Sequence, residues 1–577
     1  MRLTCKPVLG ALASTWMLAL SAGAAMPPVV DRIPADALWF VAVEDISKFQ
    51  KNAQTLAQVA GLPSQSLNVD TLLNQMGVTK GFKKDGSIAM IALPGPEWDA
   101  AMNAEPGAAE KSEPPVVLLV PTDDYGTFLG NWSKTPGQGI DEVSIQGKAN
   151  FVKKVEGGYA AIAPKKETLD KFTGAPGGAA KFKDAMGAAG AGVADRSDVL
   201  LVANMVALRP LGEKAVAKGL ERAKSQMAMM GQAGDGAGSM SGIQWLTGTF
   251  LKEAKTAIVG LNMGGSGFGM DTAVTWLPDT MMSKVFAAKG GAAELLAKLP
   301  AQPYLFAMAA DGSSEGLRAF VKSFIKESGV KDEANSVMAW FDRSDGMSVS
   351  LGLSPGGIMS GLFASTSMYV KSKDPAAYIE SFKTGLASAP DGGGKYKDAA
   401  VDVAGTKVDV WDLKVPADPN NPMAGQMGSM LYGPGGQPGG YAAKTEGGVV
   451  MTMGKNSNLM ASALKAAKGE ENLGSNALIK QVAEKLPGNR MAELWIGSKS
   501  ILDAVLPFAA MSGMNVQVDV PDNLPPVGAA IGAESGAMRM GMYVPAPVIK
   551  IFTELANSMR GEARPPVEGE DGGQPRF

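Results

Sequence analysis

The chain has 577 residues, of which 45% are hydrophobic and 19% are charged. Its formal net charge of −3 argues against nucleic acid as a partner, because basic stripes supply most of the affinity for nucleic acids. The length exceeds what one ordinary hydrophobic core serves, so two domains or more are expected.

The first 24 residues have the pattern of an export signal. Arg2 and Lys6 give a positive start, an apolar stretch follows, and Ala22-Gly23-Ala24 offers a small-residue cleavage site. An uncleaved anchor is the alternative. No other stretch approaches the roughly 20 apolar residues of a membrane span, so none is expected in the mature chain. These features predict a signal peptide over residues 1–24 and export to the periplasm or the cell surface.

The composition excludes several kinds of chemistry. The chain has no histidine, and its single cysteine, Cys5, lies inside the predicted signal peptide. Ser-His-Asp and Cys-His nucleophiles, zinc sites of His or Cys, haem bound by His and iron–sulfur clusters bound by Cys are therefore excluded in the mature chain. Carboxylate, lysine, serine or tyrosine chemistry and hard metals on oxygen ligands remain. No catalytic motif is visible, and we expect a non-enzymatic protein without a cofactor.

The elements predicted after the signal peptide alternate between strands and helices. Strand-like runs cover 34–43, 87–93, 116–121, 408–415 and 448–453. Helical patterns cover 167–172, 316–328, 374–386, 477–486 and 546–559. Consecutive hairpins are expected at 256–276 and 527–544. Antiparallel hairpins with separate helices favour the α+β class, with mainly antiparallel sheets and packed helices.

The second half of the chain repeats patterns of the first half. Pro34 and Pro300 each open an apolar run with an aromatic residue near its middle, and the hairpin at 258–276 matches the one at 526–544. We interpret these matches as a tandem duplication, with chance resemblance of α+β patterns as the alternative. The expected organisation is two related domains and a polar, Pro/Gly-rich disordered tail, at residues 31–288, 297–558 and 559–577.

Three segments differ between the halves and are rich in Gly, Pro, Ala or Met. They are expected to be loops grafted on a shared scaffold, and they cover 94–115, 225–242 and 416–440. Two of them hold methionine clusters that we take as candidate contacts for a ligand or partner: Met227, Met229 and Met230, and Met423, Met427 and Met430. Thioether clusters can bind Cu(I), form adaptable apolar surfaces, or simply fill packing space.

Three other motifs have structural explanations that we prefer to functional ones. The glycine-rich stretch at 264–269 is followed by a strand and not by a helix, so it predicts a hairpin turn and not a phosphate loop. The pairs Glu44-Asp45 and Asp123-Asp124 lie where a strand passes into a helix, which favours helix capping over metal binding or acid–base work. Trp39 is more simply a packing anchor than a binding aromatic.

The opening strand with Pro34-Ala35-Asp36, the export signal and the tandem units resemble a group of uncharacterised exported bacterial proteins with a domain of unknown function. The resemblance implies an envelope location and supplies no site residues. The first hypothesis is an exported binding or scaffold protein that acts on an unknown envelope protein through its variable loops. The alternative is a carrier or sensor of an apolar small molecule, and an enzyme using carboxylate, Lys or Ser chemistry is the third.

Overall fold

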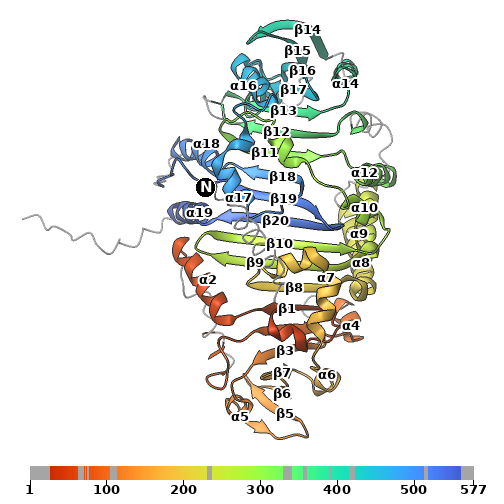
Figure 1. Cartoon of the computed structure of the whole chain (residues 1–577), viewed down its shortest axis with the longest axis vertical. Coiled ribbons are helices and arrows are strands. Elements are labelled where there is room, and N and C mark those ends of the chain that lie inside the picture. The colour runs from red at the N-terminus through yellow and green to blue at the C-terminus, as the bar shows by residue number, and fades with distance from the viewer. Residues whose placement is uncertain are drawn as a thin grey trace, which may run out of the picture.

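The computed structural model describes residues 26–62, 71, 73–74, 77–103, 114–229, 237–328, 341–354, 360–389, 393–414, 423–433, 435–511 and 518–559. The expected signal peptide and almost all of the expected disordered tail lie outside these residues. The described part is an elongated body whose long axis crosses the strands of one sheet (Figure 1). The expected α+β class is confirmed, because helices pack on an antiparallel sheet.

Within the described residues, every strand belongs to a single antiparallel sheet. The strands of the first half lie side by side in the order β4 (Lys134–Thr135), β5 (Ile140–Ile145), β6 (Lys148–Val155), β7 (Tyr159–Ala163), β3 (Val116–Pro121), β2 (Ile88–Ala92), β1 (Trp39–Val43), β8 (Val199–Asn204), β9 (Ala254–Gly264) and β10 (Gly267–Trp276).

The second half follows the same order. Its strands run β14 (Gly394–Val403), β15 (Thr406–Leu413), β16 (Gly439–Thr445), β17 (Gly448–Met453), β13 (Thr366–Lys371), β12 (Gly346–Gly352), β11 (Tyr304–Asp311), β18 (Arg490–Ile496), β19 (Val527–Glu534) and β20 (Ala537–Pro545). The shared strand order supports the proposal of a duplication. The halves do not form separate sheets, because β10 and β20 pair with each other.

The helices fill the connections between these strands. They are α2 (Ile46–Val59), α4 (Glu97–Asn103), α5 (Tyr125–Leu129), α6 (Lys166–Lys171), α7 (Gly178–Ala194), α8 (Met205–Met229), α9 (Ala237–Glu253), α10 (Met281–Val285), α11 (Ala292–Leu296), α12 (Glu315–Ser328), α14 (Pro375–Ala387), α15 (Met423–Tyr432), α16 (Ser457–Ala467), α17 (Ala477–Ala483), α18 (Ser498–Met511) and α19 (Ala546–Met559), with short 3₁₀ helices η1 (Pro28–Arg32) and η6 (Leu473–Ser475).

The acidic residues at strand ends cap helices, as expected. The carboxylate of Asp45 accepts a hydrogen bond from the Lys48 amide at 2.9 Å, and that of Asp124 accepts one from the Thr127 amide at 2.7 Å. Asp374 begins α14 in the same way. Each cap satisfies an amide that the first helical turn leaves free. The glycine-rich stretch at 264–269 forms the β9–β10 hairpin, which confirms that prediction too.

All three segments expected to be loops are partly helical, so those predictions were wrong there. Helix α4 occupies Glu97–Asn103, inside the expected loop at 94–115. Helix α8 continues to Met229 and α9 begins at Ala237, inside the expected loop at 225–242. Helix α15 occupies Met423–Tyr432, inside the expected loop at 416–440. The loops were predicted from the glycines, but the same segments contain Ala, Met, Gln and Leu, which are good helix formers.

One face of the sheet is covered by helices and holds the two largest cores. In the first half, α7 and η1 pack on this face around Phe40, Ile91 and Leu119. In the second half, α11, α16, α17 and η6 pack around Trp495 and Ala307. We call this the covered face. Because side chains alternate along a strand, the residues between these point to the opposite face.

A buried ionic cluster stabilises the contact where β10 pairs with β20, which we call the seam. The Arg539 guanidinium donates to the Ala189 carbonyl of α7 at 3.1 Å and to the Glu534 carboxylate at 2.8 Å. It also pairs with Asp271 of β10 at 3.3 Å, and Arg196 reaches the other oxygen of Asp271 at 3.1 Å. Since β10 and β20 are the last strands of their halves and run antiparallel, the halves meet as the subunits of a two-fold symmetric dimer do.

Candidate functional site

The opposite face of the sheet, which we call the open face, is apolar across both halves. One residue from each adjacent strand between β17 and β2 forms an uninterrupted apolar row, namely Met451, Met368, Val349, Met308, Leu494, Ala529, Met542, Met270, Leu261, Val199, Val43 and Ile88. An antiparallel sheet with one face in water usually carries polar residues on that face. This sheet does not follow that rule.

Several side chains of the open face are exposed to solvent. Met90 is 41% exposed and Met308 is 40% exposed, and the other large exposed side chains of this face are Phe306, Met347, Leu494 and Ile531. Large contiguous apolar surfaces are uncommon on monomers and mark sites of interaction. Methionine is prominent here, and its flexible thioether side chain adapts to ligands of irregular shape.

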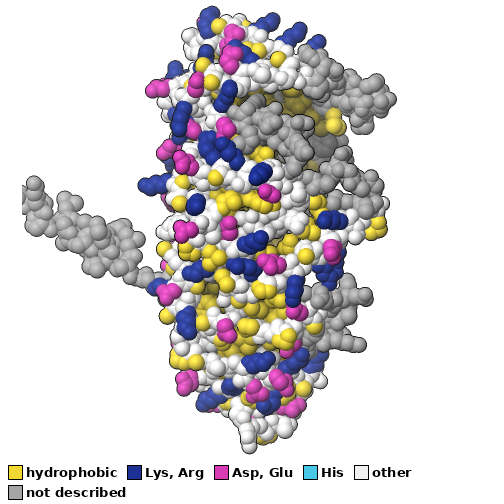
Figure 2. Space-filling model, turned by 90° about the vertical axis from the view of Figure 1, so that its right-hand side faces the viewer, with side chains coloured by type: hydrophobic (Ala, Val, Ile, Leu, Met, Phe, Trp, Pro, Cys, Tyr) yellow, Lys and Arg dark blue, Asp and Glu magenta, His cyan; other side chains and the backbone are white. Residues whose placement is uncertain are grey.

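Helices pack along both sides of the open face, over the two sets of strand ends. On one side α18 and α19 pack against Val527 and Val544, and on the other α9, α10 and α12 pack against Val274 and Met538. Figure 2 shows the side of the molecule that carries α8, α9 and α12, where hydrophobic side chains gather along the middle and charged side chains of both signs lie around them. The apolar residues of the sheet thus lie between two walls of helices.

At the end of the open face in the first half lies a pocket of about 280 Å³. Its floor is the open face of β2, β3 and β7, and its walls come from α5, β5 and the segment before β2. Asn150 is the one lining residue with an amide, hydroxyl or charged side chain; the others are Leu73, Val78, Ile88, Met90, Val116, Leu118, Val120, Phe128, Trp132, Ile145, Ile162, Ala163 and Pro164. Met90 and Ile88 also belong to the open face, so the pocket opens onto it.

The corresponding place in the second half is filled. Leu118 pairs with Ile162 across β3 and β7, and Met368 pairs with Met451 across the equivalent strands β13 and β17. Over Met368 and Met451 lies α14, whose Tyr378, Ile379, Phe382 and Leu386 pack with Trp411 into a closed core. Helix α5 is only five residues long, whereas α14 has 13. The shorter helix leaves the pocket unfilled.

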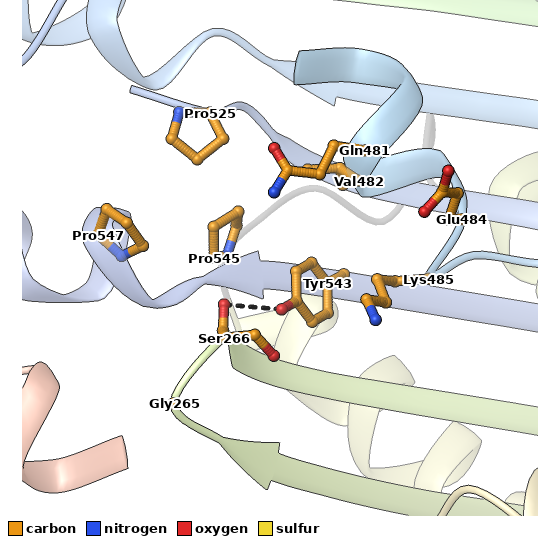
Figure 3. Close-up of a pocket in the computed structure, with 10 residues that line it drawn as sticks. All are labelled: Gly265, Ser266, Gln481, Val482, Glu484, Lys485, Pro525, Tyr543, Pro545 and Pro547. Carbon is orange, nitrogen blue, oxygen red and sulfur yellow. Dashed lines mark hydrogen bonds between the residues drawn. The ribbon is translucent and has the colours of Figure 1, made fainter. Parts of the chain in front are cut away.

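A second pocket, of about 420 Å³, lies at the junction of the two halves on the covered side (Figure 3). Gly265 and Ser266 of the β9–β10 turn face Tyr543, Pro545 and α17. The Tyr543 hydroxyl donates to the Ser266 carbonyl at 2.7 Å, which ties the turn of one half to the last strand of the other. The wall of this junction pocket therefore includes a contact that holds the two halves together.

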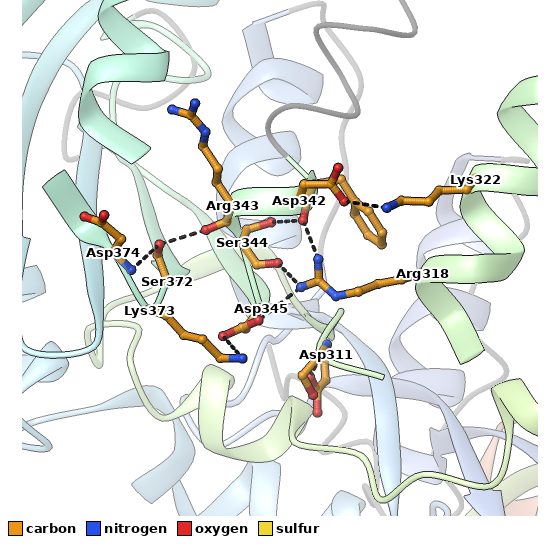
Figure 4. A network of polar contacts seen from close by, with 12 residues as sticks. Asp311, Arg318, Lys322, Asp342, Arg343, Ser344, Asp345, Ser372, Lys373 and Asp374 are labelled. Atoms are coloured by element: carbon orange, nitrogen blue, oxygen red, sulfur yellow. Dashed lines mark hydrogen bonds and ion pairs between the residues drawn. The ribbon is translucent and has the colours of Figure 1, made fainter. Parts of the chain in front are cut away.

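The charged residues between α12 and the start of β12 form a structural network (Figure 4). The Arg318 guanidinium donates to the carbonyls of Phe341 and Ser344, at 3.0 and 2.6 Å, and to the Asp345 carboxylate at 3.0 Å. The neighbouring acids are engaged too: Asp342 pairs with Lys322, and Asp311 accepts from two backbone amides. In the part of the chain that the structure describes, no three acidic residues are grouped to hold a metal ion.

The carboxyl of Glu493 lies in surroundings that disfavour its ionisation. It lies on the covered face of β18 and is 3% exposed. Burial raises the pKa of its carboxyl above the ordinary value, and the guanidinium of Arg490, 2.8 Å away, opposes this shift. The native state therefore binds a proton here at a pH where the unfolded state has released it.

This raised pKa predicts a pH dependence of stability. As pH rises from the ordinary value of 4.5 through the raised pKa of Glu493, the native state loses stability, which means that the free energy of unfolding falls. Glu493→Gln cannot titrate, so the wild type should be most favoured over this variant below pH 4.5 and lose that advantage as pH rises. Urea unfolding of both proteins between pH 4 and 8 measures the difference. A constant difference across the range would contradict the assignment.

The methionines predicted as contacts do not line the pocket of the first half. Met227 and Met229 are in the last turn of α8, where Met229 is 81% exposed, and Met230 lies outside the described residues. Met423, Met427 and Met430 lie on α15, and the last two are about half exposed. The predicted clusters are therefore on separate helices.

Sequence reasoning looked for methionine in loops and missed the methionines of the strands. Met368, Met451, Met538, Met540 and Met542 alternate with smaller or buried residues, and this alternation was the available signal. Trp39, predicted to be a core anchor, is half-buried on the open face beside Trp98, with ring centroids 6.4 Å apart. Tyr304 and Trp495, in comparable runs, are buried.

Comparisons with known proteins add little. No family model matches the chain, and no curated protein matches its sequence. Among solved structures, crystal form III of TP0453 covers 46% of this chain and 97% of its own, at 8% identity and a TM-score of 0.24. Crystal form I covers 47% and 99%, at 10% identity and 0.20. Likenesses at this level carry no argument about fold or function. No described helix is long and apolar enough to cross a bilayer.

Proposed function

We propose that this protein binds the hydrocarbon chain of a lipid or fatty acid in the pocket of the first half, which we therefore call the acyl pocket, with the polar head of the ligand at the mouth of the pocket. It would act as an exported carrier or sensor of the cell envelope. The observation that carries the proposal is the acyl pocket itself, whose lining has one amide and no charge and which opens onto an apolar sheet face. This favours the carrier over the scaffold hypothesis.

The chemistry of the lining supports a hydrocarbon chain. A ligand that entered with a carboxylate or a phosphate would need partners to replace its water, and Asn150 alone could not supply them. A methylene chain loses nothing by leaving water and gains about 0.8 kcal/mol for each buried CH₂ group. The polar head would therefore stay in solvent at the mouth of the pocket.

The difference between the halves is a second support. The scaffold is the same on both sides of the seam, yet α14 fills the place that α5 leaves empty. A core with no function gains stability when it is filled, because cavities cost packing energy. A retained apolar cavity is what a ligand site requires.

The test is titration with a dansyl-labelled fatty acid and displacement by unlabelled palmitate. Met90→Trp replaces a linear thioether on the pocket floor by a bulky indole ring and should weaken binding about tenfold or more, a change of about 1.4 kcal/mol for each factor of ten. Met308→Trp is the matched control, because Met308 lies on the same face with nearly the same exposure and does not line the pocket. It should leave the affinity within about twofold of wild type.

Two results would overturn the proposal. One is the absence of saturable binding by the wild-type protein. The other is an equal effect of Met90→Trp and Met308→Trp, which would remove the acyl pocket as the site. Near-ultraviolet circular dichroism of both variants shows whether the native packing is kept, and exposure of about 40% at both positions predicts that it is.

A further inference from the structure

A third pocket, of about 350 Å³, lies at the other end of the sheet and has a different lining. It is formed by the strand ends of β15, β16 and β17, by the turn before β13 and by the segment after α15. We call it the glycan pocket. Its residues are Phe363, Ala364, Asp412, Tyr432, Gly435, Gln437, Pro438, Gly439, Met453, Gly454 and Lys455.

The glycan pocket belongs to the second half alone. Tyr432, Gly435 and Gln437 come from the segment 416–440, which the first half lacks. That segment is held in place by backbone hydrogen bonds from Leu362 and Phe363 to the carbonyls of Met430 and Leu431, at 2.9 and 2.7 Å. The added segment therefore builds a defined wall on the shared scaffold.

Two aromatic rings line one part of the pocket. The centroids of Phe363 and Tyr432 are 5.8 Å apart, and their planes are inclined by 36°. Both residues are half-buried, so part of each ring is accessible. The face of an aromatic ring carries partial negative charge and attracts the partially positive C–H groups of a flat aliphatic ring.

A balanced pair of charges lines another part. The Lys455 ammonium lies 2.6 Å from the Asp412 carboxylate, and both side chains are nearly half exposed. Together they offer a donor and an acceptor side by side, which match the donor and acceptor capacity of neighbouring hydroxyl groups. Because the two charges cancel, the pocket has no net charge to hold a phosphate, and one carboxylate is too few for a divalent cation.

Two glycines shape the wall of the pocket. Gly454 has φ +86°, and a β-carbon on it would collide with the carbonyl of Ala364. Its amide donates to the Gly439 carbonyl at 2.7 Å, which fixes this part of the wall. Gly435 has φ +100° and borders open space. Both positions favour glycine on conformational grounds, and neither adds a side chain that would narrow the pocket.

We propose that this pocket binds a neutral carbohydrate, with a sugar ring against Tyr432 or Phe363 and its hydroxyl groups on Asp412 and Lys455. Aromatic faces combined with a neutral set of donors and acceptors suit a ligand that is apolar on its ring faces and polar at its edge. The proposal is independent of the acyl pocket, which lies at the opposite end of the sheet (Figure 1).

The test is a microarray of neutral glycans, followed by calorimetric titration of the best ligand and of inorganic phosphate. Tyr432→Ala and Lys455→Ala should each weaken glycan binding about tenfold or more, since each removes one of the two kinds of contact. Phe552→Ala and Lys407→Ala are matched controls: Phe552 is an exposed aromatic on α19, and Lys407 pairs with Asp402 outside the pocket. Both controls should bind like wild type.

Three results would overturn the proposal: no neutral glycan binds, phosphate displaces the bound glycan, or the two pocket variants bind as well as their controls. If Tyr432→Ala disturbs the fold around α15, the glycan affinity of Lys455→Ala still tests the proposal. Fatty-acid binding measured on the same variants should be unchanged, which separates failure of this proposal from failure of the proposed function.

Discussion

Replacing Arg539 by alanine is expected to lower the free energy of unfolding by about 3–5 kcal/mol. The side chain of Arg539 is 4% exposed, and its removal leaves the buried carboxylate of Asp271 without its buried partner and takes one donor from the Ala189 carbonyl. The loss falls on the seam where β10 pairs with β20, so it weakens the contact between the two halves. Urea unfolding followed by tryptophan fluorescence measures the change.

Arg196 provides the matched control for Arg539. It approaches the other oxygen of Asp271 at 3.1 Å, but its side chain is 45% exposed. Solvent screens the interaction, so Arg196→Ala should cost no more than about 1 kcal/mol. Equal losses in the two variants would show that burial at the seam does not set the strength of the pair. A separate, early transition of one half in Arg539→Ala would place the loss at the seam.

Replacing Phe382 by alanine is expected to open an apolar cavity in the second half, at the place that the acyl pocket occupies in the first. Phe382 lies on the buried side of α14, edge-on to Trp411 at 5.6 Å and to Tyr396 at 6.2 Å between ring centroids. Loss of a buried phenyl ring costs about 3–5 kcal/mol in unfolding free energy. Because an engineered apolar cavity can stay dry and bind benzene, saturating benzene should restore part of that loss.

The benzene experiment has its own control in Phe552→Ala. Phe552 lies on α19 and is 41% exposed, so its removal leaves no enclosed space and should cost less than about 1 kcal/mol. Benzene should not stabilise that variant beyond its effect on the wild type. If benzene leaves the stability of Phe382→Ala unchanged, the site has collapsed, and α14 does not simply occupy a cavity that the scaffold would otherwise hold.

Much of the secondary structure could be predicted from the sequence, because apolar periodicity and capping residues act locally. The hairpin at 256–276 corresponds to β9 and β10, and the helix at 546–559 to α19. Asp45 and Asp124 cap helices where predicted, since capping depends only on the next three residues.

The face to which a residue points was harder to predict. Pro34 and Pro300 align, and this alignment pairs Phe40 with Phe306. Phe40 is buried on the covered face, whereas Phe306 is exposed on the open face. The reason is a β-bulge between Tyr304 and Phe306, which adds one residue to β11 and turns the following side chains over. A bulge has no strong sequence signature, so the alignment concealed the difference.

The candidate sites could not be predicted from the sequence for a related reason. The acyl pocket draws on β2, β3, β5, β6, β7 and α5, and its methionine, Met90, lies in a strand that reads as ordinary core. The methionine clusters predicted as contacts in the variable segments lie on α8 and α15. Neither helix supplies a methionine to the acyl or the glycan pocket. The prediction that segment 416–440 differs between the halves did indicate the region that builds the glycan pocket.

By itself the sequence determined the α+β class, the antiparallel hairpins, the helix caps and the absence of histidine chemistry, because composition and local periodicity fix these properties. Only the tertiary structure decided that the halves share one sheet through β10 and β20, and that an apolar face runs across both. Pairing between strands far apart in the chain sets which residues become neighbours. The pocket beside α5 in the first half and the filled core beside α14 in the second depend on that pairing. They also depend on the lengths of these two helices.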